Sequence, residues 1–268
     1  ISYLLNGLVS RGVACTLICP KESPIPGLGI PPEVEVIHLN LRSEWDVPSI
    51  WKMRKMVRTF QPDILHAHDA KAHTVCRLAR TERQKVIVHR RVSFPIHRHI
   101  LTKWKYGAGV DQYIAVAECV RDRLIGIGVP KEKVAVIHSA VDLSRFSNTG
   151  QDTTVREELG LTEDQKIIGT VGRLTREKRY NWLLDTLKPI LESHPRCCLV
   201  LVGDGPERGP LESRAERLGI RDQVIFTGHR EDVPRLLAAF DIYVLCSESE
   251  GYPVSLGEAM AAGCAVVS

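Results

Sequence analysis

Residues 241–268, "DIYVLCSESEGYPVSLGEAMAAGCAVVS", contain the short run of elements that decides the fold. "DIYVLCS" predicts a strand, "ESEG" its exit loop and "PVSLGEAMAA" a helix, and "CAVVS" predicts a second strand. Pro253 suits the first turn of that helix, where a backbone N–H has no intrahelical partner in any case. A strand, a helix and a second strand in this order predict a parallel βαβ unit.

The same alternation of strand-like and helix-like segments extends over the whole chain. Uninterrupted apolar, β-branched runs are typical of strands that helices cover on both faces. Such runs lie at residues 13–20, 34–39, 63–68, 85–90, 112–117, 133–138, 166–174, 196–205, 223–229, 241–247 and 264–268. Helices are expected between them at residues 2–12, 48–60, 71–83, 117–127, 179–194, 207–218 and 231–239. The pattern predicts an α/β fold in which two doubly wound, Rossmann-like domains carry parallel sheets facing a cleft.

A polar, turn-rich stretch at residues 143–160 is the expected linker. It gives an N-terminal domain at residues 1–150 and a C-terminal domain at residues 151–268. An open parallel sheet normally has a strand before its first helix and further elements after a strand such as "CAVVS". We therefore expect a fragment, in which the N-terminal domain lacks its first strand and the C-terminal domain lacks its end.

The composition is that of an ordinary globular protein and argues against several classes. A formal net charge of +4 over 268 residues does not by itself indicate a nucleic-acid-binding protein. No apolar run approaches membrane-spanning length, and no N-terminal segment resembles a secretory signal. The eight cysteines form no Cys-x-x-Cys pair, which argues against a zinc ribbon or a redox motif. Free thiols in a reducing cytoplasm are expected.

Two carboxylates flank the start of the predicted helix after residue 252. Glu250 lies in the loop and Glu258 in the second helical turn. An ionised carboxylate only accepts hydrogen bonds and can hold neighbouring sugar hydroxyls, while the helix N-terminus suits a phosphate. Alternatively, one glutamate compensates the helix dipole and the other is merely solvated. The expected binding segment is completed by Gly251, Tyr252, Pro253 and Val254.

A second constellation, "VGRLTREKR", follows the first strand of the C-terminal domain. Arg173 offers a planar fork for phosphate oxygens, Lys178 offers a mobile charge, and Gly172 allows a close approach of the backbone. Together they could hold a diphosphate without a metal ion, although a solvated basic loop would have the same composition. Gly228 ends another strand and could contact a flat base through its backbone, or it could be part of a plain turn.

Histidines end two strands of the N-terminal domain. His89 is a candidate catalytic residue at the end of "KVIVH", and His66 and His68 end "DILHAH". The latter two could share one face as metal ligands, but the sequence supplies no third ligand beside them, so no metal is expected. Residues 89–106 are basic with interleaved aromatics. This stretch could contact a lipid-linked acceptor at a membrane surface or nucleic acid, or form an ordinary solvated helix face.

Together these segments resemble the retaining glycosyltransferases of family 4, which have the two-domain GT-B fold. The resemblance rests on "GRLTREKR", "LVGDGPER", "VIHSAVDLSRF" and the segment at residues 224–268. It implies metal-independent transfer of a sugar from a UDP- or GDP-linked donor, with no cofactor, to a glycan or lipid-linked acceptor of the cell envelope. The expected location is the cytoplasm, at the inner face of the membrane, and no nucleic acid partner is expected.

The resemblance also implies individual roles. Arg173 and Lys178 would bind the donor diphosphate and stabilise the departing nucleotide, Glu258 would hold the ribose hydroxyls, and Glu250 would contact the donor sugar. His89 matches the family's histidine close to the transferred sugar. No carboxylate stands out as a covalent nucleophile.

The sequence departs from the family pattern at several places. The glycine-rich loop after the first strand and the closing helices are absent, the segment from His138 to Asp142 replaces the common Asn-Gly-Val-Asp, and Arg179 stands where a glycine often follows the lysine. Two other classes therefore stay open: a non-catalytic nucleotide-sugar-binding module and a nucleotide-sugar epimerase of the same fold.

Overall fold

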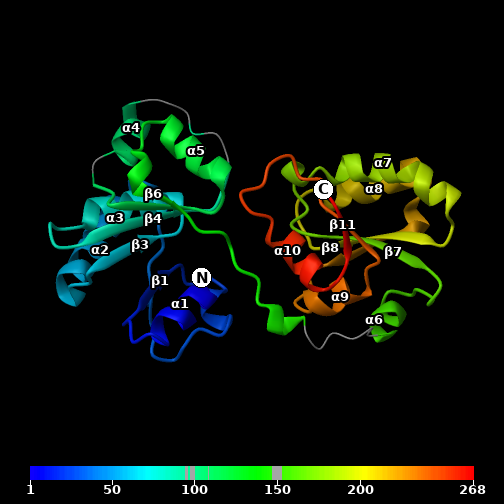
Figure 1. Ribbon diagram of the computed structural model, residues 1–268, viewed down its shortest axis with the longest axis horizontal. Coiled ribbons are helices and arrows are strands. Elements are labelled where there is room, and N and C mark those ends of the chain that lie inside the picture. The colour runs from blue at the N-terminus through cyan, green and yellow to red at the C-terminus, as the bar shows by residue number, and fades with distance from the viewer. Residues whose placement is uncertain (94–95, 97–99, 108, 147–152) are drawn as a thin grey trace. The chain divides into compact units, whose positions relative to one another are not determined.

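A computed structural model describes residues 1–93, 96, 100–107, 109–146 and 153–268 (Figure 1). The chain forms two compact units. Unit 1 comprises Ile1–Arg91 and Pro95–Ile137, and unit 2 comprises Val92–Phe94 and His138–Ser268. The domain boundary expected at residue 150 lies outside the described residues.

Unit 1 contains a four-stranded and a two-stranded sheet, both entirely parallel. The larger sheet has the order β3-β4-β5-β6, from strands Ile64–Ala67, Lys85–Arg90, Gln112–Ala115 and Val134–Val136. The smaller sheet pairs β1 (Thr16–Cys19) with β2 (Glu35–His38). The helices are α1 (Ser2–Val9), α2 (Val47–Phe60), α3 (Ala70–Ala79), α4 (Ile100–Tyr106) and α5 (Glu118–Gly126).

The register of β3 against β4 places two histidines on one face of the larger sheet. His66 pairs with Ile87, and Ala67 pairs with Val88. Because side chains alternate between the two faces of a strand, His89 on β4 shares its face with Ile87 and therefore with His66. The other face carries the buried Leu65, Ala67, Val86 and Val88.

Unit 2 is built on one five-stranded parallel sheet with the order β11-β10-β7-β8-β9. Its strands are β7 (Lys166–Val171), β8 (Cys197–Val202), β9 (Val224–Gly228), β10 (Ile242–Val244) and β11 (Ala265–Val267). Its helices are α6 (Thr153–Glu158), α7 (Tyr180–Ser193), α8 (Arg208–Leu218), α9 (Val233–Ala239) and α10 (Val254–Ala261).

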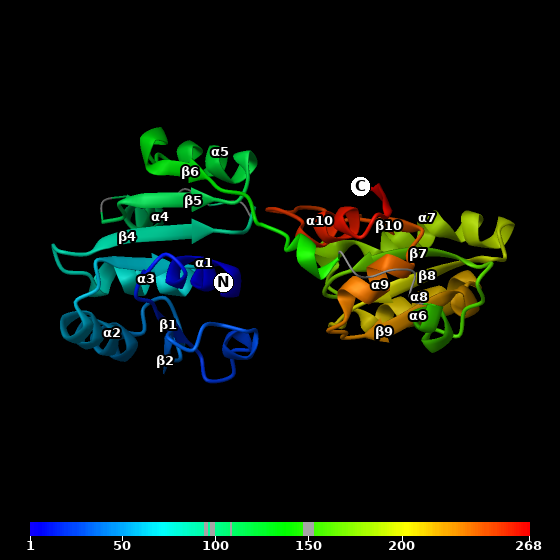
Figure 2. The same cartoon turned by 60° about the horizontal axis from the view of Figure 1, so that its bottom comes forward.

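Helices α7 and α8 lie on one face of this sheet and α6, α9 and α10 on the other (Figure 1 and Figure 2), and an apolar cluster fills the space on each side. Ile168, Leu199 and Leu201 pack with leucines of α7 and with Leu211 of α8 in one buried cluster. Their strand neighbours Ile167, Cys198, Val200 and Val202 pack in a second cluster with residues of α6, α9 and α10. The period of two in the strands thus divides one apolar run between two cores, as expected of a doubly wound sheet.

Each of the eleven predicted strands overlaps an observed strand. The expected linker at residues 143–160, however, contains helix α6, whose Val155 is fully buried and whose residues pack against α9. The segment has few apolar residues, and Val155 is the described helix residue buried in the core, so the composition alone does not indicate a helix. All eight cysteines are free, and Cys119 is exposed rather than buried. No helix in the described ranges is long and apolar enough to cross a membrane.

Gly169 on β7 tests how tightly the second core is packed. A Cβ atom there would lie 2.0 Å from two ring carbons of Phe240, which is buried. We expect Gly169→Ala to lower the free energy of unfolding by about 1–3 kcal/mol, because an overpacked core must shift. Gly209→Ala is the matched control, since its Cβ would meet nothing within 4 Å. Urea denaturation followed by circular dichroism measures both, and equal stability of the two variants would contradict this packing.

Candidate functional site

The exit loops of β7, β8 and β9 meet at the carboxyl edge of the sheet in unit 2. Gly203 has a φ of 132°, and a Cβ there would lie 2.1 Å from the carbonyl oxygen of Gly172. Its N–H donates to the carbonyl of Gly228 over 2.9 Å. No residue with a side chain fits at Gly203, so the glycine allows the three loops to touch. The predicted residues Gly172 and Gly228 therefore belong to one backbone cluster.

Lys178 and Glu250, both predicted from sequence, form an ion pair. Lys178 ends the 3₁₀ turn Arg176–Lys178 after β7, and Glu250 lies in the loop after β10. The Lys178 Nζ and Glu250 Oε1 atoms are 2.6 Å apart, and only 21% and 25% of the two side chains are exposed. The pairing concentrates one positive and one negative group at the end of adjacent strands.

Two further hydrogen bonds fasten the Glu250 loop to the 3₁₀ turn. The backbone N–H of Glu248 donates to the carbonyl of Glu177 over 2.8 Å, and the Cys246 thiol donates to the carbonyl of Lys178 over 3.1 Å. The Lys178–Glu250 contact is thus held by main-chain geometry as well as by charge.

Arg179 has a left-handed backbone conformation, which glycine adopts more readily than other residues. Its φ of 53° lies in the left-handed region, which strains a residue with a side chain. The guanidinium forms an ion pair with Glu248 over 2.7 Å and lies 4.3 Å from the centroid of the Trp182 ring. These two contacts hold the Arg179 side chain in place.

Arg173 is exposed at the same strand end. Within the described ranges, no hydrogen bond or ion pair holds its guanidinium. Its neighbour Gly172 lies against Tyr180, whose hydroxyl would be 2.7 Å from a Cβ at that position. The structure thus offers one exposed arginine and one paired lysine where a diphosphate was expected.

Helix α10 begins one residue later than predicted. Pro253 is its N-cap, with a φ of −77°, and Val254 is the first helical residue and is exposed. The ring of Tyr252 stacks on that of His138 at a centroid distance of 5.4 Å. Gly251 and Tyr252 are partly buried in the loop that leads into the helix.

Glu258 lies in the second turn of α10, as predicted, and is half-buried. Burial raises the pKa of this carboxyl, and the charge of Arg145 opposes the shift. No hydrogen bond or ion pair to its carboxylate is found among residues 1–93, 96, 100–107, 109–146 and 153–268. Glu250 is therefore neutralised by Lys178, whereas Glu258 retains its hydrogen-bonding capacity for a ligand.

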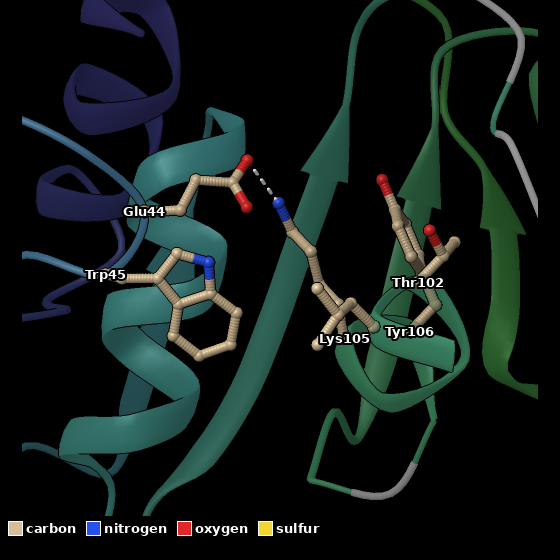
Figure 3. A pocket seen from close by; sticks show the side chains of 6 residues that line it. Glu44, Trp45, Thr102, Lys105 and Tyr106 are labelled. Carbon is tan, nitrogen blue, oxygen red and sulfur yellow. Dashed lines mark ion pairs between the residues drawn. The ribbon is translucent and has the colours of Figure 1, made fainter. Parts of the chain in front are cut away.

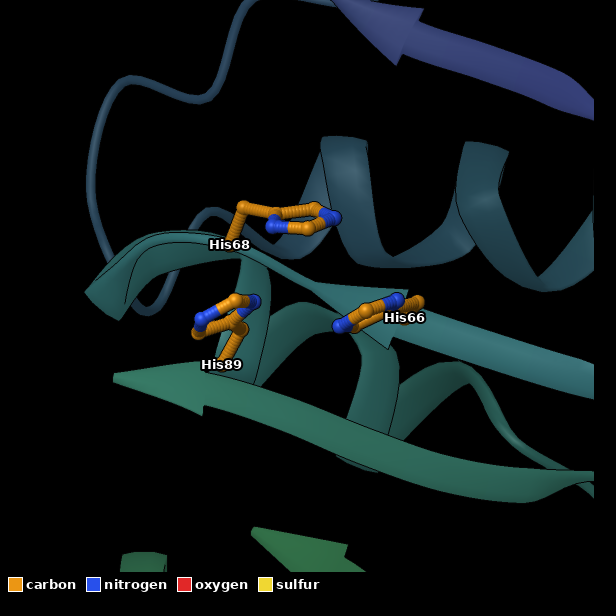
Figure 4. A group of neighbouring side chains, drawn as sticks. All are labelled: His66, His68 and His89. Atoms are coloured by element: carbon orange, nitrogen blue, oxygen red, sulfur yellow. The ribbon is translucent and has the colours of Figure 1, made fainter. Parts of the chain in front are cut away.

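The three histidines of unit 1 form a cluster that sequence analysis did not assemble (Figure 4). The ring centroids of His66 and His68 are 4.1 Å apart, and that of His89 lies 5.9 Å and 5.6 Å from them. Burial, together with the charge of Arg91, lowers the pKa of all three, to about 3 for His68 and about 4 for His89. The imidazoles are therefore neutral at physiological pH. The three histidines come together because of the register between β3 and β4, which cannot be read from the sequence.

A separate pocket in unit 1 lies between α4 and the segment before α2 (Figure 3). Lys105 Nζ is 2.7 Å from Glu44 Oε1, and the Trp45 ring faces that of Trp104 at a centroid distance of 5.3 Å. The basic stretch at residues 89–106 indicated α4 in the sequence, but no local pattern marked Glu44 or Trp45. The pocket is lined by Glu44, Trp45, Leu101, Thr102, Lys105 and Tyr106.

Two family models match the chain. One, described as glycosyltransferase family 4, matches residues 1–145, and the other, glycosyl transferases group 1, matches residues 151–268. The UDP-Gal:alpha-D-GlcNAc-diphosphoundecaprenol alpha-1,3-galactosyltransferase of Escherichia coli is 28% identical over 236 residues, covering 81% of this chain and 60% of the relative. The N-acetyl-alpha-D-glucosaminyl L-malate synthase of Bacillus anthracis is 26% identical over 230 residues, covering 82% and 59%. The chain therefore spans less than two thirds of these relatives.

Solved structures agree on the fold. A glycosyltransferase from Rickettsia africae has a TM-score of 0.84 at 18% identity, covering 98% of this chain and 73% of that one. Anabaena Alr3699/HepE in complex with UDP has a TM-score of 0.78 at 20% identity, covering 96% and 80%. The expected GT-B class is confirmed.

The Lys178–Glu250 pair generates a prediction about phosphate binding. A diphosphate must compete with Glu250 for Lys178, so Glu250→Gln should release the ammonium. Losing a competing ion pair of about 0.5–1 kcal/mol should tighten pyrophosphate binding roughly two- to fivefold in calorimetric titration. Glu192→Gln is the control, because Glu192 pairs with Lys188 on α7 instead. Weaker binding by Glu250→Gln would show that Glu250 supports the anion rather than competing with it.

Proposed function

Since the chain belongs to the glycosyltransferases of family 4 and group 1, we propose that it is a retaining enzyme that moves a sugar from a UDP-sugar to a glycan or lipid-linked acceptor. The observation that carries the proposal is the set of charged groups that follow β7 and β10 in unit 2: Lys178 is paired with Glu250, and no described residue binds the carboxylate of Glu258. The complex of HepE with UDP supports the choice of base.

The leaving group is stabilised by fixed positive charge in this proposal. As the bond between the anomeric carbon and the phosphate oxygen breaks, its electron pair stays on the diphosphate. Arg173 and Lys178 offset that charge, and the N-terminal N–H groups of α10 add partial positive charge. These groups serve without a metal ion or a cofactor.

The two carboxylates recognise different hydroxyls. Glu258 accepts hydrogen bonds from the ribose, which satisfies its half-buried oxygens. Glu250 accepts from the donor sugar once the diphosphate has drawn Lys178 away from it. In this scheme Gly228 and Gly172 present backbone to the base and the phosphates, and Tyr252 lines the entry to the helix.

Retention of configuration follows from attack on the face that the diphosphate leaves. The acceptor oxygen bonds to the anomeric carbon, and its proton passes to the departing phosphate oxygen. His89 forms a hydrogen bond with a hydroxyl of the transferred sugar, because a neutral imidazole can both donate and accept hydrogen bonds.

The acceptor side is assigned to unit 1. Helix α4 exposes Ile100 by 82% and Leu101 by 53%, and its neighbour Lys103 is also exposed. An apolar and basic surface of this kind suits an anionic membrane that presents a lipid-linked acceptor. Free thiols agree with a cytoplasmic location at the inner membrane face.

The nucleotide site is tested by calorimetric titration of UDP and GDP into the protein. We expect UDP to bind, and Glu258→Ala to weaken the binding about tenfold or more, because a hydrogen bond to a charged group contributes about 1.5–3 kcal/mol. Glu216→Ala, on the exposed side of α8, is the matched control and should bind normally.

If neither nucleotide bound to the folded protein, the proposal would be contradicted. Tighter binding of GDP than of UDP would indicate a GDP-sugar donor instead. UDP binding without release of UDP from a UDP-sugar in the presence of acceptor would favour the non-catalytic module.

Membrane contact is tested by sedimentation with vesicles of phosphatidylglycerol or phosphatidylcholine. We expect binding to the anionic vesicles, and at least a threefold loss for Ile100→Glu, because the carboxylate would have to enter the apolar layer. Leu143→Glu controls for the charge, since Leu143 is an exposed leucine of unit 2. Equal binding of the two variants to the vesicles would show that α4 does not contact the membrane.

A further inference from the structure

The imidazoles of His66, His68 and His89 lie close enough together to reach a single metal ion (Figure 4). Each offers a ring nitrogen, and the three atoms lie within 4.8 Å of one another. In zinc sites the Zn–N distance is about 2.0–2.1 Å, which separates ligand nitrogens by about 3.4 Å in tetrahedral geometry. Binding of one ion would therefore bring the ring nitrogens at most about 1.4 Å closer together than they are.

Several of these nitrogens lack the partners that buried polar atoms normally have. Nε2 of His66 and both ring nitrogens of His89 are buried without a hydrogen bond to any described residue. A ligand that satisfies them removes a cost in stability. The sheet also fixes the spacing, because His66 and His89 project from paired strands on a single face.

We propose that these three imidazoles bind one Zn²⁺ ion and leave its fourth position open to water. Three histidine nitrogens and an open position form a recognised zinc ligand set. Arg91 is the opposing group: its Nη2 lies 3.5 Å from Nδ1 of His68. Its side chain is exposed, so it can turn into solvent when the ion binds.

The bound ion occupies a nitrogen of His89. Zinc therefore inhibits sugar transfer, a consequence that rests on the proposed function of His89. The site itself does not depend on that function, because metal binding can be measured without turnover.

The test is calorimetric titration of chelator-treated protein with ZnCl₂. The protein carries Cys119→Ser, because an exposed thiol also binds zinc. We expect one equivalent to bind, His66→Gln and His68→Gln each to weaken binding at least tenfold, and Arg91→Gln to tighten it. His194→Ala, which removes an exposed histidine of unit 2, should leave binding unchanged.

The absence of saturable zinc binding, or binding that both glutamine variants retain, would overturn the metal site. Binding of inorganic phosphate in place of zinc, lost in Arg91→Gln, would make the cluster an anion site instead. Release of UDP from a UDP-sugar is then measured with and without zinc. Zinc binding with unchanged UDP release would keep the metal site and remove His89 from the proposed reaction.

Discussion

Parallel pairing constrains the rest of the structure, because all strands of a parallel sheet end at the same edge and their exit loops must share a small space. In unit 2 the loops after β7 and β8 are joined by backbone bonds: Leu174 donates to the carbonyl of Asp204, and Glu207 donates to that of Leu174, each over 3.0 Å. Gly205 permits this contact, since a Cβ there would lie 2.3 Å from the Leu174 carbonyl oxygen. The backbone of the site is therefore ordered by the fold itself, and a ligand has little left to organise.

The charged side chains depend on that frame. Lys178 and Glu250 are mostly buried, and either one alone would be a poorly solvated charge. The ion pair holds the two side chains in place. Arg179 has partners of its own, Glu248 and Trp182, although its backbone is strained. A replacement that looks disruptive in the sequence is thus accommodated locally.

The sequence predicted the positions of helices and strands better than the contacts between them. Apolar runs located every described strand, because a strand that is buried on both faces consists of consecutive apolar residues. Helix α6 was missed because Val155 alone marks its buried side. The motif residues Lys178 and Glu250 were predicted, but their ion pair joins positions 72 residues apart. Likewise, His89 joined His66 and His68 only through strand register, which no local pattern specifies.

The difference between the two glutamates bears on how the site would tell a complete nucleotide sugar from a free sugar. Glu258 is available to a ligand, because no described residue binds its carboxylate. Glu250 is held by Lys178 at 2.6 Å. In the proposed reaction a ribose can engage Glu258 directly, whereas a sugar can engage Glu250 only after an anion takes over Lys178. A free sugar brings no such anion, so it would have to break the ion pair without compensation. In the proposed reaction, recognition of the sugar is therefore coupled to the presence of the diphosphate that activates it.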